Sequence, residues 1–169
     1  MPTVPVVPLD TSHLVSTLAR DWAVQANTGT KETPVWVFVY GLSSVNPTTD
    51  LTMQDDGDIH AGGYKSQMAT AIGSNLELQG MRKGELEGEE LTPDAGQEFL
   101  RAKGQTIGYN NVVHMRVWRT DGLPDAFEQT YAVNWTDTGG DKEGLQGFTC
   151  TCTGRGKPTP ISKPTVTTP

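Results

Sequence analysis

Apolar and polar side chains alternate along most of the central chain, and this period of two constrains the fold more than any other feature. The segment AFEQTYAVNWT (126–136), for example, has Tyr131, Val133 and Trp135 on one face and polar residues on the opposite face. Successive side chains of a β-strand point to opposite sides of the sheet, so the pattern predicts strands with one buried face. The same alternation recurs in residues 21–27, 75–83, 112–119 and 145–154.

The segment LTPDAGQEFLRAKG (91–104) carries the signals of a helix instead. Thr92 is the expected N-cap and Pro93 the first helical residue. Asp94 would lie at the positive end of the helix dipole, and Gly104 is the expected stop. The apolar stripe expected on this helix consists of Ala95, Phe99, Leu100 and Ala102.

The order of these segments predicts several strands, then one helix, then three strands in succession. Turn residues at 120–126 predict a hairpin between the first two of the last three strands, and residues 137–144 separate the last two. Residues 35–40 (VWVFVY) are apolar throughout, which predicts a strand that is buried on both faces or covered by a neighbour. A mostly antiparallel β fold with one packed helix is therefore expected.

Both ends of the chain are rich in proline, which favours extended structure. We expect an N-terminal arm at residues 1–18, a β domain at 19–156 and a C-terminal arm at 157–169. Termini that simply fray are the alternative interpretation of the same composition. The first residues have neither a basic segment nor a long apolar run, so no signal peptide is expected. No stretch of the sequence approaches the apolar length of a membrane span, so none is expected.

The net charge of −7 over 169 residues argues against a protein that grips nucleic acid, because phosphate binding needs clustered Lys and Arg. The same charge suits a protein that lets DNA pass without binding it. The two cysteines, Cys150 and Cys152, alternate with threonine and are interpreted as small core residues rather than metal ligands. No catalytic set, phosphate loop or dinucleotide motif occurs, so neither an enzyme nor a cofactor is expected.

The acidic stretch TMQDDGDIHAGGYKS (52–66) does not fit a calcium-binding loop, because no glutamate closes it at the required position. A solvated loop or a contact surface is the favoured interpretation. The whole stretch from Gly41 to Ser66 reads as a long connection, and connections of that length in a compact domain are usually functional.

Several stretches in succession resemble the major tail tube proteins of long-tailed (siphovirus-type) phages, particularly those that infect actinobacteria. The resemblance covers about residues 19–162, and no single motif carries it alone. Tyr64 departs from it, because Trp is common at that position. The matching stretches, in order, are ARDWAVQANTGTKETPVW, VYGLSSVNPTTDLTMQDDGDIHAGGYKS, LELQGMRKG, TPDAGQEFLRAKG, VHMRVWRTDGLPDAFEQTYAVNW and FTCTCTGRGKPTPI.

The resemblance implies an antiparallel β-sandwich or half-barrel with one flanking α-helix and extended N- and C-terminal arms. It implies a structural virion protein, six copies of which form a ring whose inner strands make one β-barrel around a lumen. Stacked rings would form the tail tube that conducts DNA, after assembly in the host cytoplasm. The implied partners are further copies of the chain, a tape measure protein in the lumen, and tail terminator and baseplate or tail-tip proteins.

Two sets of residues are candidates for roles in such a tube. Polar strand faces are expected to include the lumen lining, with Glu77, Gln79, Glu128, Thr130 and Asn134 as candidates. The acidic loop is expected to reach another subunit or ring, where it would meet basic groups such as Lys65, Arg82 or Lys83. The loop candidates are Asp50, Asp55, Asp56, Asp58, His60, Tyr64 and Lys65.

Two other interpretations stay open at this point. The chain could be a different virion assembly protein, such as a tail terminator or a head decoration protein. It could also be a secreted or surface carbohydrate-binding β-sandwich, which would need both a signal peptide, not expected here, and an exposed aromatic patch.

Overall fold

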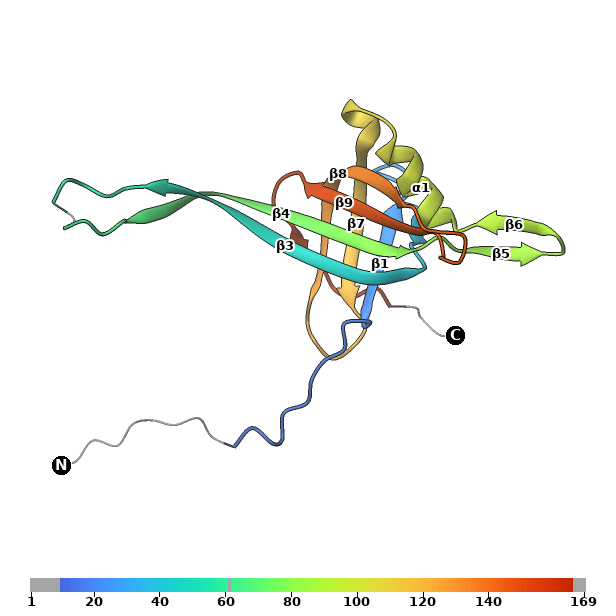
Figure 1. Ribbon diagram of the computed structural model, residues 1–169, viewed down its shortest axis with the longest axis horizontal. Coiled ribbons are helices and arrows are strands. Elements are labelled where there is room, and N and C mark those ends of the chain that lie inside the picture. The colour runs from blue at the N-terminus through green and yellow to red at the C-terminus, as the bar shows by residue number, and fades with distance from the viewer. Residues whose placement is uncertain (1–9, 61, 166–169) are drawn as a thin grey trace.

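The computed structural model describes residues 10–60 and 62–165, which form a mainly β fold with one flanking helix (Figure 1). The expected fold class is confirmed. The helices are α1 (Ala95–Gly104) and a short 3-10 helix, η1 (Gly108–Asn111). The strands are β1 (Trp22–Asn27), β2 (Trp36–Phe38), β3 (Leu42–Asp55), β4 (Gln67–Met81), β5 (Gly84–Glu87), β6 (Glu90–Pro93), β7 (Val112–Arg119), β8 (Ala126–Thr138), β9 (Gly147–Gly154) and β10 (Thr159–Pro160).

One antiparallel sheet holds most of the strands, in the order β2-β1-β7-β8-β9-β4-β3, and β10 pairs with β8 beyond the end of β9. The sheet curls strongly, so that β1 and β7 cross β4 and β9 at a steep angle in Figure 1. β5 and β6 form a separate hairpin. The order of strands around the helix, and the turns before β8 and before β9, are those that the sequence predicts.

The core lies on the concave face of the sheet, and it consists of the apolar residues that the alternation selects. Directly paired residues form cross-strand rows there: Leu76, Cys152 and Val133 make one row across β4, β9 and β8. Cys150 and Cys152 are both buried with their sulfur atoms 3.7 Å apart, as the interpretation of small core residues requires. The remaining buried members include Val24, Leu78, Leu100, Met115, Val117, Tyr131, Trp135 and Phe148.

The helix begins two residues later than predicted. Asp94, not Thr92, is the N-cap, because its carboxylate accepts a hydrogen bond from the Gln97 amide at 2.9 Å. Thr92 and Pro93 belong to β6 instead, where Thr92 pairs with Glu85. Thr92 and Pro93 are residue types typical of a helix start, but residues 90–93 form β6, which pairs with β5 in the hairpin.

The buried side of α1 also differs from the predicted stripe, because Ala95 and Ala102 are exposed. Gly96, Gln97 and Leu100 face the sheet instead. A Cβ on Gly96 would lie 2.2 Å from the Phe38 carbonyl oxygen, so only glycine lets the first turn of the helix approach this closely.

Gln97 is a fully buried polar side chain that joins three segments. Its Nε2 donates to the carbonyl oxygens of Tyr40 and Met81 at 2.7 and 3.0 Å, and its Oε1 accepts from the Lys83 amide at 3.3 Å. These backbone groups lie where β2 and β4 end, so they lack sheet partners. The side chain therefore replaces the missing sheet hydrogen bonds and fixes the helix to the sheet.

Two expectations about the strands are wrong. Residues 35–40 are not buried on both faces: β2 is an edge strand, and Phe38 and Tyr40 are exposed. The stretch from Gly41 to Ser66 is not one long loop, because residues 42–55 form β3, which pairs with β4 along its whole length. β3 and β5–β6 were not recognised from the sequence because their side chains are mostly exposed and show no clear apolar alternation.

Replacing Gln97 with alanine should lower the free energy of unfolding by about 2–4 kcal/mol, since it leaves buried backbone groups without hydrogen-bond partners. Denaturant unfolding of the purified chain measures this change. Gln54→Ala on the exposed part of β3 is the matched control and should change stability by less than about 0.5 kcal/mol. Equal effects of the two substitutions would contradict the role assigned to Gln97.

Candidate assembly surfaces

The long hairpin of β3 and β4 projects far beyond the body of the molecule, as the cyan and green strands of Figure 1 show. Its outer part continues the core face of the sheet, but no other element of the described residues covers it. Leu51 and Ile72 are direct cross-strand partners on this face, and their side chains are 54% and 74% exposed. Met53 and Met68 nearer the tip are exposed as well, and several exposed apolar side chains on a protruding hairpin are typical of a segment that packs on another molecule.

The predicted loop residues lie at or near the tip of this hairpin, with one exception. Asp55 ends β3, and its Oδ1 accepts from the Gly57 amide at 2.8 Å, while Asp58 Oδ1 accepts from the His60 amide at the same distance. Asp50 lies well inside β3, where its carboxylate accepts a hydrogen bond from Asn75. The tip residues Asp56, His60, Tyr64 and Lys65 are exposed.

All five candidates for a lumen lining lie on one face of the sheet, the convex face opposite the core. The register shows this directly, because Glu77 of β4 pairs with Thr151 of β9, which pairs in turn with Asn134 of β8. Gln79 stands beside Glu77, and its Nε2 donates to the Glu77 carboxylate at 2.7 Å. Around this row the convex face of β9 carries threonines, so the face beside Glu77 is mostly polar, with Ala132 of β8 as an apolar member.

Glu128 and Thr130 share that face but have a different environment. Glu128 is paired with Arg116 across β7 and β8, and its carboxylate lies 3.8 Å from the His114 imidazole. Arg116 in turn donates to Gln25 at 2.6 Å and stacks over the Trp36 ring at 4.3 Å. The convex face therefore has a polar half on β4, β9 and β8 and an aromatic, charged half on β7, β1 and β2.

The aromatic half ends at the edge strand β2. The rings of Phe38 and Tyr40 stack at 5.6 Å, and Phe38 also contacts Trp118 at 5.9 Å. Aromatic side chains and arginine are enriched at the energetic centres of protein interfaces. This cluster beside an unpaired strand edge is the part of the surface that sequence reasoning missed, since Phe38 and Tyr40 were expected to be buried or covered.

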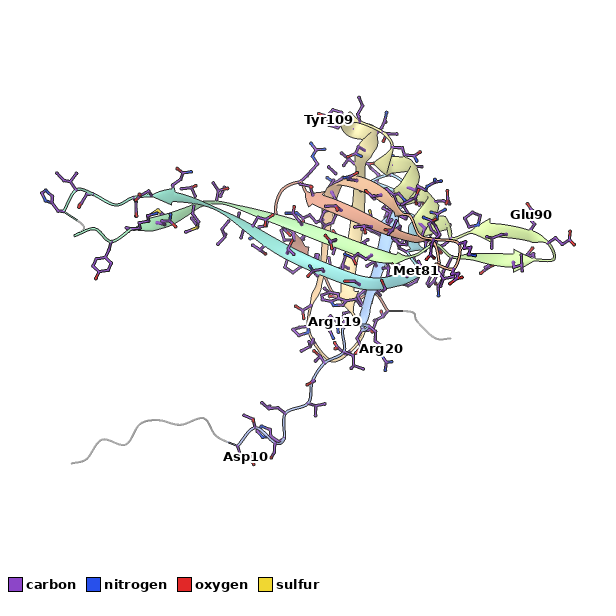
Figure 2. The ribbon with its side chains drawn as sticks, in the orientation of Figure 1. Asp10, Arg20, Met81, Glu90, Tyr109 and Arg119 are labelled. Atoms are coloured by element: carbon purple, nitrogen blue, oxygen red, sulfur yellow. The ribbon has the colours of Figure 1, made fainter. Side chains whose placement is uncertain are left out.

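Arg119 and Asp121 lie where the N-terminal and C-terminal segments meet the body, at the lower end of β7 (Figure 2). Its guanidinium pairs with the Asp121 carboxylate, donates to the Leu18 carbonyl at 2.9 Å and lies over the Trp22 ring. On the same turn, Lys163 Nζ donates to the Asp121 carbonyl at 2.6 Å. The exposed N-terminal segment from residue 10 and the C-terminal segment thus leave from one junction.

The C-terminal segment lies against the sheet before it reaches this junction. Thr159 pairs with Glu128, and the Ile161 amide donates to the Ala126 carbonyl at 3.1 Å. Residues 10–20 of the N-terminal segment are exposed and contain two isolated turns, at residues 12–13 and 19–20, rather than a helix. The outer parts of both predicted arms, residues 1–9 and 166–169, lie outside the described residues.

The described residues contain no group of three or more His, Cys, Asp or Glu side chains that could hold a metal ion. Among residues 10–60 and 62–165, no helix has the length and apolar character needed to cross a membrane. The surfaces that stand out are the long hairpin with its exposed apolar side chains, the mostly polar half of the sheet face and the aromatic sheet edge.

Comparison with known proteins gives matches in structure but not in sequence. No protein-family model and no curated protein matches the chain. A chain in the tail of an empty gene transfer agent (GTA) particle with C6 symmetry matches with a TM-score of 0.61 at 10% identity, over 87% of this chain and 100% of its own length. A chain in the virion of a native GTA particle gives 0.61 at 11% identity with the same coverage.

A chain in the baseplate of the anti-feeding prophage aligns more weakly, with a TM-score of 0.49 at 10% identity. The two GTA matches show that this chain has a fold that occurs in virus-like tail particles. At such low identity they establish the fold and not the role of the chain.

The Arg119–Asp121 ion pair predicts that the free energy of unfolding depends on pH in the acidic range. The hydrogen bonds from Arg119 lower the pKa of Asp121 from its ordinary value of 3.8 to about 2. A lowered pKa in the folded state gives stabilisation that is full above about pH 4 and is lost as the pH falls through about 2. Unfolding measured from pH 6 to 2 should show wild type more stable than Asp121→Asn, with a difference that shrinks below about pH 4.

The matched control is Asp125→Asn, which removes a carboxylate from the same turn without removing the Arg119 partner. It should leave the acid dependence of wild type unchanged. A constant difference between wild type and Asp121→Asn over this pH range would contradict the role of the ion pair.

Proposed function

We propose that this chain is a structural subunit of a tail tube of the kind found in long-tailed phages, and that its copies form stacked, hexameric rings around a lumen that conducts DNA. The observation that carries the proposal is the match over the full length of a chain in a C6-symmetric GTA tail. The tail tube resemblance of residues 19–162 supports the same assignment independently of that match.

The shape of the monomer supports self-association. The sheet ends in two outer strands, β2 and β3, which have no partner on their outer sides among the described residues. Unpaired edges invite further strands, and closing the sheet across subunits would remove them. The hairpins β3–β4 and β5–β6 project in opposite directions along the longest axis (Figure 1), which suits a head-to-tail contact that repeats around a ring.

The polar half of the convex face is the proposed lumen lining, with Glu77, Gln79 and Asn134 as its central residues. Its hydroxyl and amide groups offer no fixed positive charge to DNA, and Glu77 repels phosphate. Glu128 and Thr130 remain candidates at its margin, beside the Arg116 cluster. The overall charge of −7 is consistent with passage of DNA without binding.

The remaining parts of the proposal come from the tail tube resemblance. The chain would reside in the virion tail after assembly in the host cytoplasm. Its partners would be other copies of itself, a tape measure protein inside the lumen during assembly, and terminator and baseplate or tail-tip proteins at the two ends. It would need no cofactor and would catalyse no reaction.

Negative-stain electron microscopy of the purified chain, over a range of protein and salt concentrations, tests the proposal. Hollow tubes or stacked rings are the expected result. A chain that stays monomeric under every condition would contradict self-assembly into a tube and would favour a terminator or head decoration role.

A second function has one observation in its favour, the exposed aromatic cluster of Phe38 and Tyr40 on the β2 edge. Carbohydrate-binding β-sandwiches use such aromatic surfaces to stack sugar rings. Binding of the monomeric chain to glycans, lost in Tyr40→Ala, would favour this function over the tube.

Substituting Glu77 with lysine should leave tubes intact but slow DNA ejection by roughly severalfold, since every ring would then present lysines to the phosphates. Ejection from particles that carry the variant, followed by fluorescence of released DNA, measures this. Glu87→Lys on the β5–β6 hairpin makes the same charge change away from the sheet face and is the control. Normal kinetics with Glu77→Lys would exclude this face from the lumen.

A further inference from the structure

A cavity of about 340 Å³ lies between the β1–β2 turn, the last turns of α1 and the start of β7. Lys31, Lys103 and His114 are its titratable lining groups, and no Asp or Glu belongs to the lining that the structure describes. His114 has an acidic neighbour outside the lining, since the Glu128 carboxylate lies 3.8 Å from its imidazole, so the positive charge of the cavity comes from the two lysines. Two lysines with no acidic lining residue give the cavity a positive charge in a chain whose net charge is −7. The cavity is therefore suited to an acidic ligand.

The lysines of this cavity are available for a ligand. Neither Lys31 nor Lys103 forms an ion pair within residues 10–60 and 62–165. Lys103 Nζ lies 5.6 Å from the centre of the Phe99 ring, which places the ammonium group at the cavity wall. Further hydrogen-bonding groups in the lining come from Asn27, Thr28, Thr30 and Thr130.

The turn that carries Lys31 is held in place by its own hydrogen bonds. Asn27 Oδ1 accepts from the amides of Gly29 and Val35, both at 2.9 Å, and Asn27 Nδ2 donates to the Thr30 carbonyl at 2.9 Å. A Cβ on Gly29 would lie 2.4 Å from the Thr33 carbonyl oxygen, so the turn also needs glycine at this position. A turn fixed in this way presents Lys31 with little loss of backbone entropy on binding.

The other basic groups considered for the acidic tip are less suitable. Arg82 is already paired with Glu98 and lies over the Trp135 ring, and Lys65 belongs to the tip itself. Lys83 lines a cavity at the base of the β5–β6 hairpin, but Glu85 and Asp94 line the same cavity. Carboxylates brought to Lys83 would therefore meet like charges.

We propose that the basic cavity receives the carboxylates of Asp56 and Asp58 from the β3–β4 tip of a second copy of this chain. The proposal rests on the proposed function and names the surface that the tip contacts. The tip of each copy points away from its own body (Figure 1), so the contact joins two molecules. A cavity of this volume admits a few side chains rather than a whole loop, which fits docking through carboxylates.

Charge complementarity is the argument for this occupant. The tip concentrates Asp55, Asp56 and Asp58 within four positions, and the cavity concentrates the opposite charge. Asp56 has no intramolecular partner for its side chain among the described residues, so it is free to bind. Because the ion pairs form at a partly exposed interface, the contact should weaken as salt is added.

The test uses two full-length variants with reversed charges, one with Asp56→Lys and Asp58→Lys and the other with Lys31→Glu and Lys103→Glu. Sedimentation and electron microscopy measure self-association, and circular dichroism checks that both variants fold. Each variant alone should need at least tenfold more protein to assemble than wild type. An equimolar mixture should regain assembly, because each tip then meets a cavity of opposite charge on the other variant.

Matched controls place the same charge changes elsewhere: Glu87→Lys with Glu89→Lys, and Lys142→Glu with Lys157→Glu. These variants should assemble like wild type. The docking site would be overturned if the reversed-charge variants assembled normally, or if the folded variants did not recover assembly when mixed. The proposed function would still stand in either case, provided that the wild type assembles. A wild-type chain that never assembles would overturn both.

Discussion

The rest of the structure depends on the apolar rows that cross β4, β9 and β8. Leu76, Cys152 and Val133 form one row, and neighbouring rows extend it toward α1. These rows bury one face of the sheet and leave the other polar. They also end at Leu76, although β3 and β4 continue outward for many more residues. Everything beyond that point, including the hairpin tip, is stabilised only by strand pairing and by whatever it contacts in another molecule.

A monomer built in this way separates its stable and its associating parts. The buried rows and the Gln97 hydrogen bonds hold the body together, while the hairpins, the edge strands and the N-terminal segment carry little buried surface. Exposed leucine and isoleucine on a paired hairpin cost little as long as a neighbour covers them. The proposed tube gives each of these surfaces a partner, and the basic cavity gives the acidic tip one.

Much of the fold could be predicted because alternation marks each strand that has one buried face. The segments containing Val24, Leu76, Met115, Tyr131 and Phe148 were all identified in this way. β3 could not be found, since its outer part is exposed on both faces and the period of two disappears. The helix start was misplaced because local cap signals at Thr92 competed with hairpin pairing, and pairing between distant residues cannot be read from a local pattern.

The sequence by itself determined which candidate residues of one strand share a face, because alternation is local: Glu77 with Gln79, and Glu128 with Thr130 and Asn134. Strand pairing then places both sets on the same side of the sheet. Only the tertiary structure decided what stands beside each of them, such as Arg116 beside Glu128. It also decided that the acidic stretch caps a long hairpin, and that Lys31 and Lys103, far apart in the chain, line one cavity. The reason is that the alternation of side chains between the two faces of a strand depends only on neighbouring residues. Register and packing depend instead on which strands and helices meet in space.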